Sequence, residues 1–550
     1  MMAKTHPFIA IGLMCAVPAF LFPGTGAYLR LRSLLVVFAA CGILWLLAIW
    51  LRKICGRCFT WRTWAVWMTF ALALAGLFAY SILIGEKNVL ITLYIGIWAG
   101  ALVLYSLWGT GRLTASRAAA AIAFVGFSLR LCYVFYTNIY TRSYDVTPWG
   151  GVGHLAYIEA LLEGKLPEMV FHPEVGACQF YHPPFHHFIM AICLKIGTLL
   201  GWAFEKTGQR SAAPEAMQFI TLFYAAACLV YFYRLLKRFG VTGRALVVSV
   251  AVIAFYPMFI LLGGSVNNDI LSILLAVAAL WYTVQWYDVP TIKNILKIAL
   301  CIGFGMMTKL SVWMVAPGIA TVFLVVWWRE RKHPWRCIGQ FSLFGLLCAP
   351  LGLWWSIRNY LLYKMPPTYV PGMPIDDAQY IGYLSVGQRL SNWDMTNVFH
   401  DIPNTNNSNP IVELLKSGIF GEMKVDWLVG WPQVLFWVSV VLAVAAFVAM
   451  IALFVKKTPE ICPTLKAMLG ITYVVIMVSY IIFCFQFPFL CTENARYVMP
   501  AIVITVLFFG MGLCRIQHRK KWRWLVRVAE AATALFCACT CVVYGATGLL

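Results

Sequence analysis

The sequence predicts an all-α membrane protein that crosses the bilayer many times. Its 550 residues are 62% hydrophobic and only 11% charged, whereas about a quarter of the residues in soluble domains are charged. Apolar runs of roughly 20 residues, long enough to cross a hydrocarbon core, recur along the whole chain. These runs are uninterrupted, which favours helices over the short alternating strands of a membrane β-barrel.

We expect about fifteen transmembrane helices, placed by the length of each apolar run. The first five cover residues 8–22, 33–51, 65–84, 89–108 and 117–137. The others cover 218–235, 244–263, 270–287, 294–308, 311–328, 338–355, 431–455, 466–485, 497–514 and 523–546. The first run has no clear cleavage site, so we interpret it as a retained helix rather than a signal peptide.

The net charge of +21 predicts the orientation of these helices. Lys and Arg occur in short clusters between apolar runs and not along one face, a pattern that fits cytoplasmic loops and disfavours nucleic acid as a partner. The clusters are Arg52–Arg62, Arg112 with Arg117, Arg234–Arg244, Arg329–Lys332, Lys456 with Lys457, and Arg515–Arg523. All of them face the cytoplasm only if residues 185–201 do not cross the membrane, so we expect a re-entrant or interfacial helix there.

Three parts of the chain follow from this pattern. Residues 1–110 form four N-terminal helices of unknown role, residues 111–515 form a membrane core, and residues 516–550 form a C-terminal helix. Two long loops of the core, 138–217 and 356–430, are expected outside the cytoplasm and contain juxtamembrane helices. The polar chemistry therefore gathers on the extracytoplasmic side, which we interpret as the side of the functional site.

The first polar stretch, SYDVTPWGGVGHLAYIEALLEG at 143–164, follows the helix expected at 117–137. Asp145 lies at the bilayer edge, where a partly desolvated carboxylate is suited to act as a general base. The alternative is a residue that makes a turn or caps the next segment. His154 and Tyr157 are expected to share one face of the helix that follows.

The second stretch, FYHPPFHH at 180–187, belongs to a region that holds five of the nine histidines. Pro183 and Pro184 start a helix and hold Tyr181 and His182 at its N-terminus, a position suited to an anion such as phosphate. The alternative is a histidine that simply lies among the lipid headgroups. A metal site would draw on His154, His172, His182, His186 and His187, but adjacent residues on a helix point in different directions. We therefore expect no required metal or other cofactor.

Four further stretches place polar residues at helix ends on the same side. They are Asn267-Asn268-Asp269, Thr308-Lys309, Arg358-Asn359 and Glu493-Asn-Ala-Arg496-Tyr497. Asn and Asp could simply cap a helix, and the arginines could extend toward the interface. Cations outside the cytoplasm run against the positive-inside bias, however, and together they predict a pocket for an anion.

In this order, the six stretches resemble the GT-C superfamily of polyprenyl-phosphate-sugar glycosyltransferases, nearest to its protein O-mannosyltransferase and aminoarabinose transferase branch. The resemblance covers residues 115–515. It implies an inverting transfer on the extracytoplasmic face with no required metal, and Asp145 as the general base. It implies donor-phosphate contacts from His182, Lys309, Arg358, Arg496 and Tyr497. Other pocket candidates are His154, Tyr157, Tyr181, Asn268, Asp269 and Glu493.

Two features depart from the family pattern. Asp145 is followed by Val146 where mannosyltransferases carry an Asp-Glu pair, and the helix after the HPP segment lacks the arginine that many relatives have near its start. The sugar and the acceptor, which could be a lipid, a glycan or a protein, are therefore left open. We expect a bacterial cytoplasmic membrane protein. The alternatives are a transporter or flippase of lipid-linked saccharides and a metal-binding membrane sensor.

Overall fold

The architecture comes from a computed structural model that describes residues 6–21, 90–140, 145–146, 153–169, 178–199, 203–206, 209–212, 216–332, 334–402, 408–456 and 461–546. The described elements are helices apart from one antiparallel hairpin of β1 (Ala203–Lys206) and β2 (Gln209–Ala212). Within these residues, nine helices are long and apolar enough to cross a membrane, or ten if one bent pair counts as a single span. The predicted all-α, multi-pass membrane fold is confirmed. The expected count of fifteen stays a prediction, since 33–51 and 65–84 lie outside the described residues.

The helix bounds follow the apolar runs closely. The N-terminal half contains α1 (His6–Leu21), α4 (Leu90–Gly109), α5 (Ala115–Tyr136), α6 (His154–Leu162), α7 (Phe185–Leu199), α8 (Met217–Arg238), α9 (Gly243–Phe255), α10 (Pro257–Gly264) and α11 (Asp269–Asp288). The other half contains α12 (Ile292–Met306), α13 (Ala316–Arg329), α14 (Pro334–Tyr363), α15 (Val386–Ser391), α16 (Pro410–Phe420), α17 (Trp431–Val455), α18 (Pro463–Gln486), α19 (Met499–Ile516) and α20 (Arg523–Ala546). Short 3₁₀ turns precede or join them at Cys178–Tyr181, Leu310–Val315, Leu490–Thr492, Ala495–Val498 and Lys520–Trp522.

The run expected at 244–263 is divided into α9 and α10, which meet at a bend of 43°. Pro257 causes the break, because proline has no N–H to donate to the carbonyl four residues earlier. That carbonyl belongs to Ile253, and it accepts a hydrogen bond of 2.8 Å from the guanidinium of Arg130 on α5. Arg130 is almost fully buried. An arginine inside the bundle thus adds to the backbone hydrogen bond of 3.4 Å that this carbonyl accepts from the Tyr256 N–H at the break.

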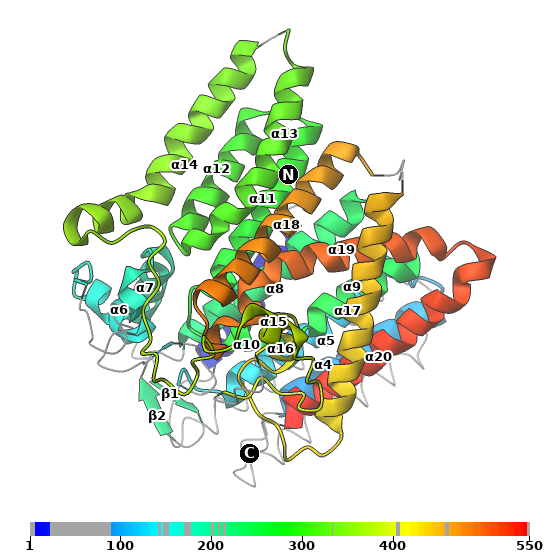
Figure 1. The fold of residues 1–550 in the computed structure, drawn as a ribbon. Coiled ribbons are helices and arrows are strands. Elements are labelled where there is room, and N and C mark those ends of the chain that lie inside the picture. The colour runs from blue at the N-terminus through cyan, green and yellow to red at the C-terminus, as the bar shows by residue number, and fades with distance from the viewer. Residues whose placement is uncertain are drawn as a thin grey trace.

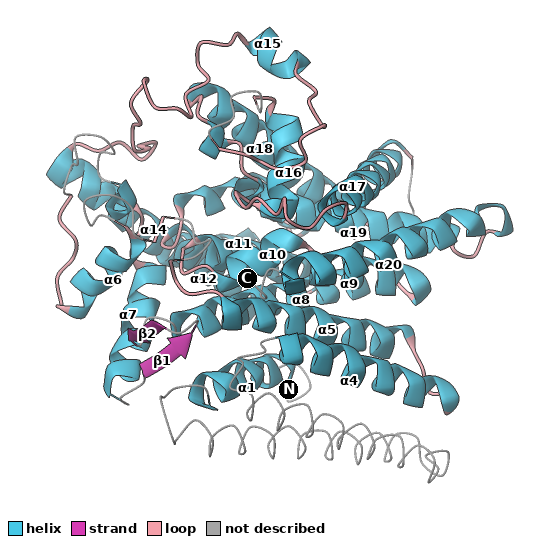
Figure 2. Cartoon of the chain, turned by 90° about the horizontal axis from the view of Figure 1, so that it is seen from below, coloured by secondary structure: helices cyan, strands magenta, loops and turns pink. Residues whose placement is uncertain are grey.

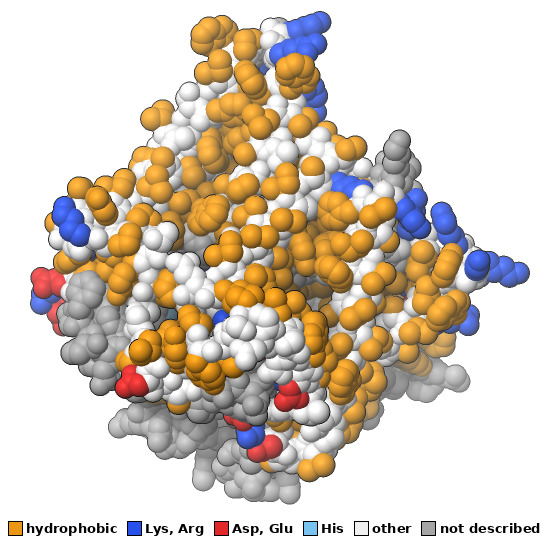
Figure 3. All heavy atoms as spheres, in the orientation of Figure 1, with side chains coloured by type: hydrophobic (Ala, Val, Ile, Leu, Met, Phe, Trp, Pro, Cys, Tyr) orange, Lys and Arg blue, Asp and Glu red, His pale blue; other side chains and the backbone are white. Residues whose placement is uncertain are grey.

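The two ends of the bundle differ in charge. Ion pairs of Arg238 with Asp288 and of Arg244 with Glu530 join helix ends at the basic end. Figure 3 shows Lys and Arg side chains gathered at the top and right edges of the view, near the α13–α14 and α19–α20 connections. The start of α11, the end of α5 and the start of α19 lie at the other end. The opposite end of α11 is Asp288, which pairs with Arg238 at the basic end, and the opposite ends of α5 and α19 carry Arg117 and Arg515. The polar stretches and the basic clusters therefore lie at opposite ends.

Helices α6 and α7 pack against each other beside the bundle, at the lower left of Figure 1. Helix α7 has 15 residues and is not among the helices long enough to span. Loops with α15 and α16 cover the same end of the bundle as seen in Figure 2. The helix after the HPP segment, α7, is therefore short enough to be the re-entrant or interfacial helix that we expected there.

We predict that a topology reporter fused after Gly201 reports the extracytoplasmic side. The reason is that a non-spanning α7 keeps the basic cluster at Arg234–Arg238 in the cytoplasm. Accessibility of a single reporter cysteine or activity of a fused alkaline phosphatase measures this. A fusion after Arg329 is the matched control and should report the cytoplasm; a cytoplasmic signal from both positions would show that α7 crosses the membrane.

Candidate active site

Two cations and two carboxylates from four separate elements form the centre of the site. Lys309 pairs with Asp269, and the guanidinium of Arg496 lies 3.8 Å from the other oxygen of Asp269. Arg496 also reaches Asp145, with 3.3 Å between Nη1 and Oδ2. The sequence analysis predicted all four residues for one site, and the structure brings them together. We call them the charge cluster.

Asp269 lies at the start of α11, and its neighbours anchor that start. The amide of Asn268 donates to the carbonyl of Thr308 at 3.1 Å, and Asn267 accepts from the backbone N–H of Asp269. Capping was the alternative to the predicted role of Asn268 in the pocket: it occupies the cap position, but its side chain makes no capping hydrogen bond. It joins α11 to the turn that carries Lys309.

Lys309 is placed by the turn between α12 and the 3₁₀ turn that follows. Its backbone N–H donates to the carbonyl of Gly305 in the last turn of α12. The side chain is 15% exposed, and that of Asp269 only 4%. A buried ammonium group needs an anionic partner, because desolvation of an isolated charge is costly. Its partner here is Asp269 on a different helix.

Arg496 follows a turn that Asn494 begins, since the side-chain oxygen of Asn494 accepts from the Arg496 N–H at 3.1 Å. The guanidinium donates to the hydroxyl of Tyr497 at 2.9 Å and lies 5.0 Å from the centre of its ring. Lys309 lies 4.9 Å from the same ring. Tyr497 therefore faces both cations, as expected for a residue of the same pocket.

Asp145 has a positive φ of 56°, a left-handed conformation that is uncommon outside glycine and tolerated best by Asn and Asp. Its backbone carbonyl accepts from the N–H of His154 at 3.0 Å, and so serves the start of α6. The carboxylate is thereby free of the capping role and turns to Arg496. Its side chain is 41% exposed, so a second molecule can approach it.

The HPP segment is fixed by hydrogen bonds to its backbone. The carbonyl of Tyr181 accepts from Trp355 at 3.0 Å, and the carbonyl of His182 accepts from Tyr157 at 3.0 Å. The N–H of Phe185, at the start of α7, donates to Met307 at 3.0 Å. The expected anion site on the free amides of this helix is therefore wrong for Phe185, whose amide is already used.

The histidines form a buried stack behind the charge cluster. The ring of His187 lies 4.0 Å from that of Tyr157, and its Nε2 lies 2.8 Å from Nδ1 of His154. His182 stacks on His154 with 5.9 Å between ring centres. Burial, and then the charge of Lys309, hold the pKa of His182 well below its usual range. His182 is thus neutral near pH 7.

Three other predicted residues or groups have different surroundings. Arg358 is half-buried and lies over the ring of Trp355 at 4.6 Å, outside the charge cluster. Glu493 does not line the cleft: its carboxylate pairs with Arg389 at 2.6 Å. Within the described residues, no group of three or more His, Cys, Asp and Glu side chains has an arrangement that could hold a metal ion. His172 lies outside the described residues.

A cleft adjoins the charge cluster on its apolar side. Asp269, Lys309, Arg496 and Tyr497 line its polar part. The remaining lining is largely apolar: Ile273, Ala276, Val312, Met314, Val315, Ile476 and Pro500, with Ser272 and Ser311. The lining thus places charged side chains next to an apolar surface. Helix α18 and its Ile476 were not predicted for the site, because an apolar spanning helix has no polar residue to single it out.

Comparison with known proteins agrees with the predicted resemblance. Residues 181–355 match the family model described as dolichyl-phosphate-mannose-protein mannosyltransferase, which confirms the predicted resemblance over this segment. Among solved structures, the chain is similar to ArnT from Cupriavidus metallidurans in the apo state, with a TM-score of 0.44, 13% identity, and coverage of 78% of this chain and 77% of that chain. The same protein bound to undecaprenyl phosphate gives a TM-score of 0.43 at 12% identity, with coverage of 79% and 76%. A comparison with curated proteins finds no match.

We predict that Lys309→Met destabilises the protein by roughly 3 kcal/mol, because it leaves the buried Asp269 without its ammonium partner. The double variant Lys309→Met/Asp269→Asn should recover much of this loss. Thermal unfolding in detergent measures both variants. Equal unfolding temperatures for the wild type and Lys309→Met would show that the pair contributes no net stability.

Proposed function

We propose that this protein is an integral membrane glycosyltransferase that moves a sugar from a polyprenyl-phosphate donor to an acceptor, with inversion. The observation that carries the proposal is the meeting of Asp145 with Arg496, 351 residues later in the chain, beside the Lys309–Asp269 pair. A base next to two cations suits the displacement of a phosphate leaving group. The family match of residues 181–355 supports the same reaction class.

The proposed reaction is a single displacement. The acceptor hydroxyl oxygen forms a bond to the anomeric carbon while the bond from that carbon to the phosphate oxygen breaks. The polyprenyl phosphate leaves with the electron pair, and the hydroxyl proton passes to Asp145. Because the hydroxyl would attack the anomeric carbon from the face opposite the departing phosphate, a single displacement inverts the configuration at that carbon.

The net charge of the charge cluster would change as this reaction proceeds. In the structure its two positive charges face two negative ones. When Asp145 takes the proton its charge is lost, and Arg496 no longer has an ionised partner there. Negative charge grows on the leaving phosphate at the same moment. Arg496 is therefore best able to stabilise that phosphate when the donor bond breaks, and Lys309 adds its positive charge nearby.

The other donor contacts are proposed from their positions. Neutral His182 lies close enough to Lys309 for that charge to lower its pKa, and would donate a hydrogen bond to a phosphate oxygen. Tyr497 faces both cations of the cluster. The apolar lining near Val315 and Ile476 would hold the first part of the polyprenyl chain. Arg358, which lies over Trp355, would contact the donor only at the rim.

The side of the reaction follows from the distribution of charge. The basic residues that favour the cytoplasm lie at the end of the bundle opposite the charge cluster. We therefore propose an extracytoplasmic site in a bacterial cytoplasmic membrane. The donor would be made in the cytoplasm and flipped outward. The acceptor would be a lipid, glycan or protein, and no residue in the proposed reaction needs a metal.

We predict that Asp145→Asn lowers kcat for sugar transfer by about 10²–10⁴-fold, since the amide cannot accept the proton. The variant should bind the donor at least as well as the wild type, because a negative charge next to Arg496 is removed. Turnover of a panel of polyprenyl-phosphate sugars, with a membrane extract as the acceptor source, measures kcat and identifies the sugar.

Asp288→Asn, which removes a carboxylate from the arginine pair at the opposite end, is the matched control and should retain activity. Transfer at the wild-type rate by Asp145→Asn would remove Asp145 as the base. A wild-type protein that binds donors and never cleaves the sugar–phosphate bond would favour the transporter or flippase alternative.

We predict that Arg496→Ala weakens donor binding by roughly 1.5–3 kcal/mol, the value of a hydrogen bond to a charged group, and changes acceptor affinity less. The reason is that its guanidinium faces the leaving phosphate. Separate titrations of a polyprenyl phosphate and of the acceptor measure the two effects, with Arg244→Ala at the opposite end as the control. A larger loss for the acceptor would move Arg496 to the acceptor side.

A further inference from the structure

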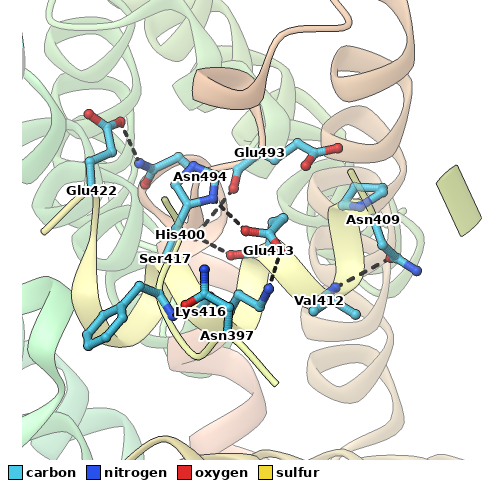
Figure 4. A network of polar contacts seen from close by, with 12 residues as sticks. Asn397, His400, Asn409, Val412, Glu413, Lys416, Ser417, Glu422, Glu493 and Asn494 are labelled. Carbon is cyan, nitrogen blue, oxygen red and sulfur yellow. Dashed lines mark hydrogen bonds and ion pairs between the residues drawn. The ribbon is translucent and has the colours of Figure 1, made fainter. Parts of the chain in front are cut away.

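A second set of charged side chains lies directly behind the turn that presents Arg496. Arg389 of α15 pairs with Glu493 at 2.6 Å, and the two side chains are 2% and 0% exposed. His400 Nδ1 lies 2.7 Å from Glu413 Oε2 of α16, and Lys416 lies 2.9 Å from its Oε1. All five side chains are buried. We call these five residues the buried charge network; Figure 4 shows all of it except Arg389.

This network is costly for a loop at the membrane surface. Desolvation of two ions often exceeds the attraction between them, so apolar side chains of similar size would commonly be as stable or more stable. An account of the network therefore needs something besides stability. The position of the network gives such an explanation, because Glu493 is three residues before Arg496 in a segment of 3₁₀ turns.

Ser417 connects α16, which carries Glu413 and Lys416, to that segment. Its hydroxyl donates to the carbonyl of Glu413 at 2.6 Å, and it accepts from the N–H of Ala495 at 2.9 Å. The same oxygen lies 3.3 Å from the carbonyl of Glu493. Asn494, between them, donates to Glu422 at 3.1 Å. Ser417 of α16 thus holds the backbone at Glu493 and Ala495, and Glu422, just after α16, holds the side chain of Asn494 between them.

We propose that the buried charge network and Ser417 are positioning residues for Arg496. The network fixes residues 493–495, and this fixed turn aims the guanidinium at Asp145 and at the donor phosphate. None of these positioning residues needs to touch the substrate. The phosphate part of this statement rests on the function proposed above, whereas the fixed turn is a property of the fold.

His400 makes this arrangement sensitive to pH. The groups that face it are Glu413 and Lys416 of α16, Glu493 with its partner Arg389, Glu422 after α16, and the neighbouring Asp401, which pairs with Lys424. Burial acts to lower the pKa of His400, but the hydrogen bond and charge of Glu413, with Glu422 and Glu493, outweigh it and raise the pKa. Because the pKa of His400 is raised in the folded protein, protonated His400 stabilises the network fully below the pKa of the unfolded chain. This stabilisation is lost as pH rises through the pKa of the folded protein.

The test measures Kd of a polyprenyl phosphate without sugar on the full chain in detergent. Ser417→Ala removes the link to Ala495 without leaving a buried charge unpaired, and should weaken binding by about 10–100-fold. Arg389→Met, which unpairs Glu493, should act in the same direction. In the Arg496→Ala background both changes should have little further effect, because contacts that act through one residue are not additive.

Lys424→Gln is the matched control, since it removes an exposed ion pair from the same loop and should leave Kd unchanged. Wild-type Kd for Ser417→Ala, or equal losses with and without Arg496, would overturn the proposal. A network that only stabilised the fold would lower the unfolding temperature of Arg389→Met and leave Kd of its folded fraction unchanged.

The pH profile adds a readout that a purely structural role would not give. At each pH, the Kd for His400→Gln is divided by the Kd for the wild type. Both proteins bind the same ligand, so the effect of phosphate protonation is the same in both values and drops out of the ratio. We expect the largest ratio at low pH, where wild-type His400 is charged, and a ratio near one above its pKa. A ratio that does not change with pH would remove His400 from the positioning residues.

Hydrogen exchange separates this proposal from the proposed function. Peptides that cover residues 490–498 should exchange faster in Ser417→Ala and Arg389→Met than in the wild type, with or without lipid. If the wild type binds no polyprenyl phosphate but this difference is present, the proposed function fails while the fixed turn stands. Unchanged exchange would overturn the fixed turn itself.

Discussion

The placement of two cations at the end of an apolar bundle opposite its basic clusters is the constraint on which the site depends. Each cation needs a carboxylate within a few ångströms, because water does not fully solvate it there. Lys309 finds Asp269 on another helix, and Arg496 finds Asp145 in a loop more than three hundred residues earlier. The pairs therefore determine where the start of α11, the turn after α12 and the loop after α5 meet.

The two carboxylates of this cluster have different environments, which suggests different roles. Asp269 is 4% exposed, accepts a hydrogen bond from the side chain of Asn267 and is tied to Lys309, so it serves as a fixed counter-ion. Asp145 is 41% exposed and has a strained left-handed backbone that its neighbours must maintain. Only Asp145 combines an adjacent cation with an open face, which is what a base for an incoming hydroxyl requires.

Much of this arrangement could be predicted from the sequence, for specific physical reasons. Spanning helices follow from apolar length, and Lys309 and Arg496 drew attention because cations on the outer side are unfavoured. The break at Pro257 was not predicted, although the proline is itself visible in the sequence. The sequence does not reveal that Arg130, 123 residues before Ile253, binds the carbonyl at this break. Asn268 was predicted for the pocket, with a helix cap as the alternative, and neither prediction names its partner Thr308, 40 residues away. Local patterns identify the polar residues but not their distant partners.

Glu493 shows most clearly where such reasoning fails. It was assigned to the pocket because it stands three residues from Arg496, yet in the structure it faces Arg389, from which it is 104 residues distant. Glu493 and Arg496, three residues apart in one short segment, thus belong to two separate charged groups. A displacement of the backbone on the Glu493 side has to be absorbed within three residues, and a segment of tight turns offers little freedom to absorb it. The loop that contains α15 and α16 is therefore part of the active-site structure, although none of its charged network lines the cleft.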